Sequence, residues 1–93
     1  MSLKLDITHD TEKFLDKLPP KQFRQVVKAL LKLTSNPEPH DSDELKGHAP
    51  WRRQDIGEYR IVYYVIDDDV LRVPLIGKRN DDEVYKKLKR LNS

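Results

Sequence analysis

The sequence contains no cysteine and no long hydrophobic run, and these absences exclude several kinds of protein. Without cysteine the chain can form no disulfide bond, no thiolate metal site and no cysteine nucleophile, which fits a reducing compartment. No stretch approaches the roughly 20 consecutive apolar residues of a membrane span, and the N-terminus lacks the basic patch and apolar run of a signal peptide. We therefore expect a soluble, unexported protein that acts in the cytoplasm and has no membrane partner.

Glycine is scarce and the histidines are scattered, which bears on phosphate and metal binding. The three glycines stand too far apart to form a glycine-rich phosphate loop. The three histidines, at positions 9, 40 and 48, lack the i, i+4 spacing of metal ligands on one helix. The serines have no elbow motif around them. We therefore expect neither a metal site nor a cofactor.

What the chain does have is a high and nearly balanced charge. It carries 18 Lys and Arg against 16 Asp and Glu, a formal net charge of +2, with 37% hydrophobic and 37% charged residues. The apolar residues are gathered in periodic blocks, unlike those of a disordered chain. The length of 93 residues therefore predicts one small domain over positions 1–93, with a thin core.

The N-terminal third predicts a strand and two helices. Apolar residues alternate with polar ones over positions 3–7, which is the period of a half-buried strand. Capping residues at 8–11 precede a short helix that Pro19-Pro20 ends. Pro20 suits the first position of a second helix, which ends near 35–37 and carries an apolar stripe at helical spacing: Phe23, Val26, Val27, Leu30 and Leu31.

The remainder predicts a loop, three strands and a helix. Three prolines and several acids make positions 36–50 an irregular segment. Strands follow at 51–56, 59–66 and 70–76, of which 59–66 gives the strongest signal and is expected to be central. Pro74 implies a bulge or an unpaired edge position in the last strand. Capping residues at 80–82 then introduce a C-terminal helix with a narrow stripe of Val84, Leu88 and Leu91.

These elements define the expected fold class. We predict a small α+β domain in which an N-terminal strand and a helical hairpin pack on an antiparallel sheet of about four strands, with a C-terminal helix. Basic residues gather in the C-terminal half, where Arg60 lies on the central strand, Arg79 lies where the last strand ends, and Tyr85 lies in the first turns of the helix. An antiparallel meander can bring these three together if the strand ends coincide.

Guanidinium groups around a phenol suit phosphodiester chemistry on RNA. A ribose 2′-hydroxyl can attack the adjacent phosphate when a base takes its proton, cations hold the charge that builds on phosphorus, and a donor protonates the departing 5′-oxygen. Two simpler interpretations stay open. The basic residues can form an ordinary solvated face, and Tyr85 can serve only to pack the helix on the sheet.

Five short motifs, in order, resemble the RelE branch of the RelE/ParE toxin superfamily. They are L-K-G at 45–47, W-R-R at 51–53, G-E-Y-R-I-V-Y at 57–63, G-K-R at 77–79 and E-V-Y at 83–85. The resemblance implies the toxin of a type II toxin–antitoxin pair, a ribosome-dependent messenger RNA endonuclease that cuts the A-site codon without a metal. It also implies a cognate antitoxin, the ribosome and mRNA as partners, in a homodimer or a toxin–antitoxin hetero-oligomer.

The resemblance assigns roles residue by residue. Arg60 would hold the scissile phosphate, Arg79 would stabilise the developing charge and donate the leaving-group proton, and Tyr85 would orient or deprotonate the 2′-hydroxyl. The expected RNA-binding residues are Arg52, Arg53 and Lys78.

The chain also departs from the family pattern. Because Arg52 and Arg53 are adjacent, only one of them can face the site in a regular strand, and the sequence does not say which. Asp55 adds a negative charge nearby, and Pro74 can shift Arg79 relative to Arg60.

Two other functions stay open. One is a ParE-like toxin that inhibits DNA gyrase without ribonuclease activity, and the other is an inactive, antitoxin-binding homologue. Retention of Arg60, Arg79 and Tyr85 favours the nuclease, because a pure binder needs no such set.

Overall fold

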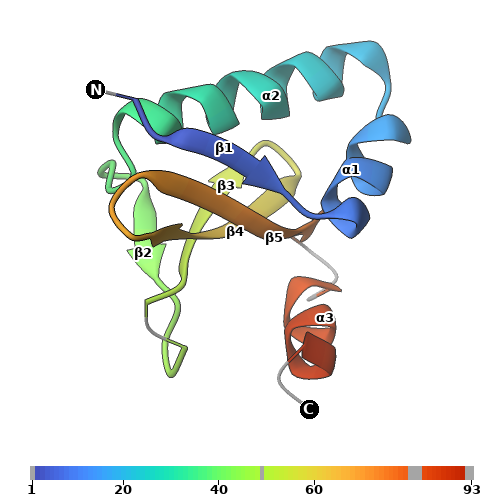
Figure 1. The fold of residues 1–93 in the computed structure, drawn as a ribbon. Helices are drawn as coiled ribbons and strands as arrows, with labels where there is room; N and C mark the ends of the chain where they lie inside the picture. The colour runs from blue at the N-terminus through green and yellow to red at the C-terminus, as the bar shows by residue number, and fades with distance from the viewer. Residues whose placement is uncertain (1, 49, 80–82, 92–93) are drawn as a thin grey trace.

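The protein folds into eight elements, seen here in a computed structural model that describes residues 2–48, 50–79 and 83–91 (Figure 1). In chain order they are β1 (Lys4–Ile7), α1 (His9–Asp16), α2 (Pro20–Ser35), β2 (Ser42–Glu44), β3 (Arg52–Ile56), β4 (Tyr59–Ile66), β5 (Val70–Lys78) and α3 (Glu83–Leu91). The α+β class is confirmed, as are the helical hairpin and the C-terminal helix. The predicted capping residues at 80–82 and the side chain of Leu91 lie outside the described part of the chain.

The helical hairpin begins where the capping chemistry places it. The side-chain oxygen of Thr8 caps α1 by accepting a hydrogen bond from the backbone N–H of Thr11 at 3.3 Å. The Thr11 hydroxyl in turn donates to the carbonyl of Val73 at 2.8 Å, which ties α1 to β5. Pro20 opens α2, because the missing N–H of proline costs nothing in the first turn of a helix.

The sheet has five strands in the order β1-β5-β4-β3-β2. β4 lies at its centre, as predicted. The sheet differs in two ways from the expected four antiparallel strands. β1 pairs with β5 in parallel, and Ser42–Glu44 forms a short edge strand against β3 inside the segment predicted to be irregular. The other neighbouring pairs are antiparallel.

The predicted irregularity at Pro74 is a β-bulge. Val62 pairs with Leu75, and Tyr64 pairs with Arg72, so two residues of β5 stand opposite the single residue Tyr63. The carbonyl of Pro74 accepts a hydrogen bond from the Thr8 hydroxyl at 3.1 Å. The bulge therefore sits where α1 joins the sheet.

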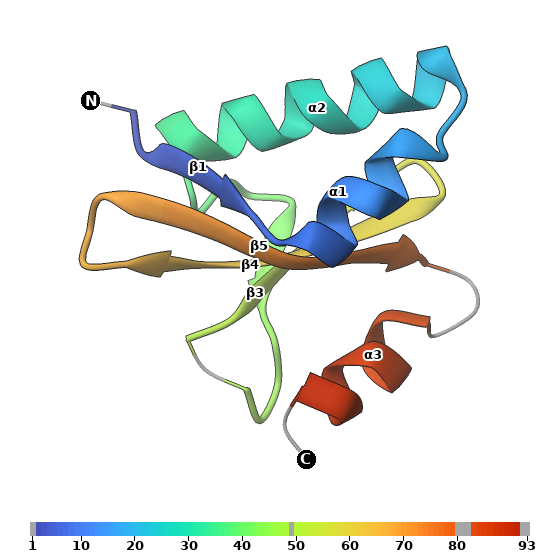
Figure 2. The same ribbon diagram turned by 45° about the vertical axis from the view of Figure 1, so that its right-hand side comes forward.

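The two faces of the sheet have different cores. Figure 2 shows α1 and α2 on one face, here called the hairpin face, and α3 on the other, the α3 face. The hairpin face holds the larger core: Leu15, Val26, Ala29, Leu30, Leu33, Tyr59, Ile61, Tyr63, Leu71, Val73 and Ile76. The α3 face holds a smaller one: Leu45, Val62, Leu75, Val84 and Leu88, with Trp51 and Tyr85 against it. Within the described ranges each helix falls short of the length and apolar character that a bilayer crossing requires.

Candidate active site

A tight hairpin between β3 and β4 places two arginines on the α3 face. The two strands are connected only by Gly57-Glu58, so Ile56 lies opposite Tyr59. This pair sets the register of the other cross-strand pairs of β3 and β4. Arg53 therefore stands opposite Val62, a buried residue of the α3 core. Because cross-strand partners project from the same face, Arg53 and Arg60 both belong to the α3 face.

Tyr85 of α3 lies against both arginines. Its hydroxyl oxygen accepts a hydrogen bond from Arg53 Nη1 at 2.7 Å and one from Arg60 Nη1 at 3.2 Å. The Arg60 guanidinium also lies 5.5 Å from the centre of the Tyr85 ring. Val84 and Leu88, buried against β4 and β5, hold the helix that carries this phenol. The structure thus brings together two of the predicted catalytic residues, Arg60 and Tyr85, with Arg53.

Asp55 completes this group, which we call the arginine–tyrosine cluster (Arg53, Asp55, Arg60 and Tyr85). Its carboxylate accepts from Arg60 Nε at 2.7 Å and from Nη2 at 3.1 Å, a bidentate ion pair. The hydrogen bond from Arg60 lowers the pKa of Asp55, partial burial opposes this, and the charges of Arg60, Arg79 and Arg53 lower it further. The carboxylate therefore stays ionised and offsets one of the cationic charges.

Arg79 lies at the edge of the arginine–tyrosine cluster. Its backbone N–H donates to the carbonyl of Glu58 at 2.9 Å, which fixes the end of β5 beside the β3–β4 turn. Its side chain is exposed, and its charge acts on Asp55. The backbone of Arg79 is therefore held beside the β3–β4 turn while its side chain lies in solvent.

The structure places Lys78 and Arg52 away from this cluster. Lys78 pairs with Tyr59, so it projects from the hairpin face. Arg52 projects from the face opposite Arg53 and donates to the Ser42 hydroxyl at 2.9 Å. One N–H of that side chain, Nε, is buried without a hydrogen-bond partner among the described residues. Of the two adjacent arginines, it is Arg53 that faces Tyr85.

The role of Asp55 as the direct partner of Arg60 was missed from sequence, although a signal for it was present. A two-residue turn at Gly57-Glu58 places Asp55 opposite Arg60 by counting alone, and opposite charges on such a pair attract. From the sequence alone, Asp55 is only a negative charge near the arginines. The structure makes it a specific partner.

The described residues contain no cluster of three or more histidine and acidic side chains that could hold a metal ion. The arginine–tyrosine cluster holds two guanidinium groups, a carboxylate and a phenol. It offers guanidinium N–H groups for an anion and a phenol that can accept or donate a proton.

Comparisons with known proteins agree with this architecture. The family model for the ParE toxin of the type II toxin–antitoxin system parDE matches residues 5–83. The free E. coli RelE toxin, in a form with two arginines replaced by alanine, is 30% identical with a TM-score of 0.79, over 97% of this chain and 98% of that one. No curated protein sequence gives a significant match.

Two solved complexes are also similar. The same arginine-to-alanine form of E. coli RelE, bound to a peptide of the antitoxin RelB, is 28% identical with a TM-score of 0.74, over 95% of each chain. The archaeal RelE–RelB complex from Pyrococcus horikoshii OT3 is 25% identical with a TM-score of 0.76, over 87% of this chain and 99% of that one. The chain belongs to the RelE/ParE superfamily of type II toxins. Within that superfamily the similarity to RelE over nearly its whole length confirms the predicted RelE branch.

Proposed function

We propose that this single toxin domain is a ribosome-dependent mRNA endonuclease that cleaves A-site codons by attack of a ribose 2′-hydroxyl. The observation that carries the proposal is the Tyr85 hydroxyl held between two guanidinium groups, at 2.7 Å from Arg53 and 3.2 Å from Arg60. The proposed partners, the ribosome and its mRNA, place the activity in the cytoplasm.

The proposed mechanism uses only side chains of the chain itself. Tyr85, reacting as the phenolate, orients the 2′-hydroxyl and accepts its proton, so that the oxygen attacks the adjacent phosphorus. Arg60 and Arg53 stabilise the negative charge that builds on the phosphoryl oxygens. Arg79, at the exposed edge, adds to this charge stabilisation and donates a proton to the departing 5′-oxygen. The products are a 2′,3′-cyclic phosphate and a free 5′-hydroxyl.

The Nε–Nη2 edge of Arg60 holds Asp55, and its Nη1 donates to Tyr85. A phosphate that binds Arg60 through the Nε–Nη2 edge in bidentate fashion therefore has to displace Asp55. The side chain of Asp55 is 34% exposed, against 13% for Arg60, so water can solvate the displaced carboxylate.

We further propose a cognate antitoxin as the protein partner, forming a toxin–antitoxin hetero-oligomer. The solved RelE relatives include complexes with the antitoxin RelB. A disordered amphipathic segment that folds on this toxin could displace or cover α3, whose buried contacts are few. Amide hydrogen exchange of α3, measured with and without the antitoxin, tests this proposal. If the antitoxin left the exchange at Tyr85 unchanged, it would have to inhibit the toxin without displacing or covering α3.

A second function is supported by the family model. The matching model is that of the ParE toxin, so a toxin that inhibits DNA gyrase and leaves RNA intact is the alternative. The arginine–tyrosine cluster favours the nuclease, because a toxin that only binds its target needs no phenol held by two guanidinium groups.

The test is to add the purified protein to an in vitro translation reaction and map mRNA 5′ ends by primer extension. We expect cuts confined to ribosome-occupied codons, reduced by about 10²–10⁴ in Tyr85→Phe. Arg79→Ala should also lose most of the cutting. Tyr64→Phe is a matched control on the α3 face, since Tyr64 stacks on Trp51 and not on the cluster. Intact mRNA together with inhibited gyrase supercoiling would replace the nuclease by the alternative.

A further inference from the structure

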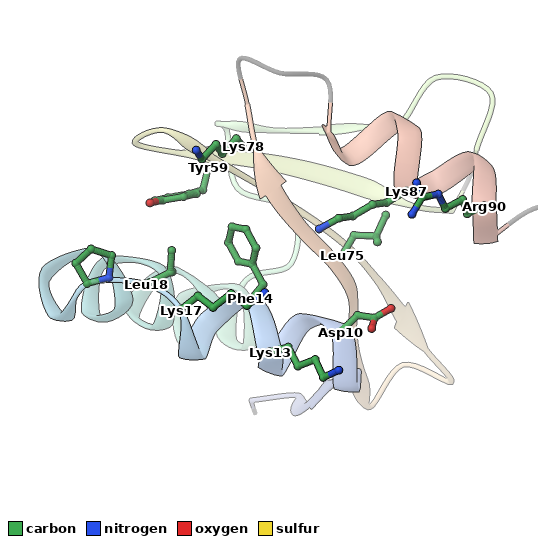
Figure 3. Close-up of a pocket in the computed structure, with 11 residues that line it drawn as sticks. Asp10, Lys13, Phe14, Lys17, Leu18, Tyr59, Leu75, Lys78, Lys87 and Arg90 are labelled. Carbon is green, nitrogen blue, oxygen red and sulfur yellow. The ribbon is translucent and has the colours of Figure 1, made fainter.

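A cleft between α1 and α3 lies outside the arginine–tyrosine cluster. It has a volume of about 690 Å³, within the range of about 300–1,000 Å³ that ligand sites occupy. Figure 3 shows Phe14 pointing into it from α1, with Tyr59 and Leu75 of the sheet on its walls. The Phe14 and Tyr59 rings meet edge to face, with centroids 5.7 Å apart. The cleft is therefore a concave surface with an apolar floor.

The rim of the cleft is strongly cationic. Among the residues that the structure describes, five basic side chains and one carboxylate, that of Asp10, line the cleft: Lys13, Lys17, Lys78, Lys87 and Arg90. Over the whole chain the two signs nearly balance, with 18 basic and 16 acidic residues. Basic side chains thus outnumber acidic ones among the described residues that line this cleft, unlike in the chain as a whole, and such an excess raises the local concentration of anions.

The cleft and the arginine–tyrosine cluster lie on opposite sides of one helix. Tyr85 of α3 contacts Arg53, whereas Lys87, two residues later, places its ammonium group 5.4 Å from the centre of the Phe14 ring. Residues two apart on a helix project about 200° from each other, which agrees with these contacts. A strand that passes around the helix from one site to the other therefore covers about half its circumference, roughly 16–19 Å for a diameter of about 10–12 Å.

The surface between the two sites is basic as well. Lys86 and Lys89 are exposed on α3. A strand of phosphates leaving the cluster would therefore meet cationic groups along the helix before it reached the cleft. An acidic peptide would also meet positive charge in the cleft, but nothing about a peptide links the cleft to a cluster suited to phosphodiester chemistry.

We propose that the cleft between α1 and α3 is a second RNA-binding site, which holds backbone phosphates of the single strand whose scissile phosphate lies at the arginine–tyrosine cluster. Lysine and arginine of the rim contact the phosphates, as in other grooves that follow a single-stranded backbone. The inference rests on the proposed function for the identity of the strand. It assigns Lys13 and Lys17 to RNA binding, and neither was a candidate from sequence.

The experiment measures binding of a fluorescent 12-nucleotide RNA by anisotropy, with every 2′-hydroxyl methylated so that it cannot be cut. The test variant is Lys13→Ala/Lys17→Ala, and the matched control is Lys28→Ala/Lys32→Ala. Both pairs are exposed, both have i, i+4 spacing on the helical hairpin, and both remove two charges. Only the first pair lines the cleft.

We expect the test variant to bind about 10-fold more weakly, with the control within about twofold of wild type. The slope of log K against log salt should fall in magnitude by about 1.4 in the test variant, or 0.7 for each lost phosphate contact. Equal weakening in both variants, or no measurable binding of the wild type at low salt, would overturn the proposal. So would an oligoglutamate of equal charge, or adenosine monophosphate, that bound as tightly as the strand.

Cleavage of translated mRNA by the wild type, measured beside RNA binding by the two lysine variants, separates this inference from the proposed function. If the wild type cut no mRNA but the test variant still lost RNA binding selectively, the nuclease would fail and the second site would stand. If the wild type cut mRNA and the two lysine variants bound RNA equally, the second site would fail alone.

Discussion

The two faces of the sheet differ in what their residues do. On the hairpin face, α1 and α2 cover an apolar core in which Val26, Ile61 and Tyr63 are fully buried. On the α3 face a much smaller core stops short of the turn between β3 and β4, and the remaining surface carries Arg53, Arg60 and Tyr85. The same strands supply both faces, because successive residues of a strand project in opposite directions.

The difference teaches how a short chain can combine stability with a charged site. Burial of apolar area scales with the size of the core, so the hairpin face supplies most of the folding free energy. The α3 face can then hold guanidinium groups close together, although like charges repel. Asp55 reduces that repulsion by pairing with Arg60.

The largest expected effect on the free energy of unfolding comes from a substitution in the core of the hairpin face. Leu30→Ala should lower the free energy of unfolding by about 2–5 kcal/mol, because Leu30 is 1% exposed in the larger core. Leu88→Ala should cost less in global unfolding, since α3 can detach locally and limit the loss. Chemical denaturation of both variants checks the contrast, and equal losses would show that the two cores contribute alike.

A smaller effect is expected on the rate of mRNA cleavage, and it should differ between the adjacent residues Arg52 and Arg53. Arg53→Ala should slow mRNA cleavage by about 100-fold, because it removes a hydrogen bond to the Tyr85 hydroxyl and a charge beside the phosphate. Arg52→Ala should change the cleavage rate less than about threefold, since Arg52 contacts Ser42 on the opposite face. Single-turnover cleavage on programmed ribosomes measures both, and a comparable loss in both variants would contradict the assigned faces.

The smallest effect concerns Asp55. Asp55→Asn should lower the free energy of unfolding at neutral pH by about 1–2 kcal/mol, because a charge-assisted pair becomes a weaker neutral hydrogen bond. The pKa of Asp55 is lowered in the folded state from an ordinary value of 3.8, so the unfolded chain takes up this proton first as pH falls. The stabilisation from the Asp55–Arg60 pair is therefore complete well above pH 3.8. It is lost as the pH falls through the pKa that Asp55 has in the folded state.

Thermal unfolding of wild type and Asp55→Asn over a series of pH values tests this order. The gap between the two melting curves should be widest near neutral pH and should close in acid. A gap independent of pH would mean that the carboxylate charge does not contribute.

The sequence predicted most of the fold because its local signals were strong. The stripe of α2 and its opening proline gave Pro20–Ser35 nearly to the residue, and Pro74 marked the bulge. The parallel pairing of β1 with β5 could not be predicted in this way, because alternation identifies a strand but not its partner. The short strand β2 has no apolar alternation, and its place depends on pairing with β3.

The site was predictable in part. Motif resemblance singled out Arg60, Arg79 and Tyr85, and two of these three meet in the arginine–tyrosine cluster with Arg53. The side on which Arg53 projects depends on the register of the β3–β4 hairpin, which adjacent arginines alone do not reveal. The cleft could not be predicted, because it joins α1 to α3 across tertiary contacts that no local pattern encodes.

Tyr63→Phe and Tyr85→Phe test the central claim most directly, because each substitution removes one hydroxyl group, and the two hydroxyls lie on different faces of the sheet. Tyr63 is fully buried on the hairpin face and donates to the carbonyl of Pro37 at 2.7 Å, whereas the Tyr85 hydroxyl belongs to the arginine–tyrosine cluster. The measurement is the single-turnover cleavage rate and the unfolding midpoint of Tyr63→Phe and Tyr85→Phe. The account predicts that Tyr85→Phe loses about 10²–10⁴ in rate with little change in stability, and that Tyr63→Phe loses stability and keeps its rate. Full cleavage by a folded Tyr85→Phe would contradict it.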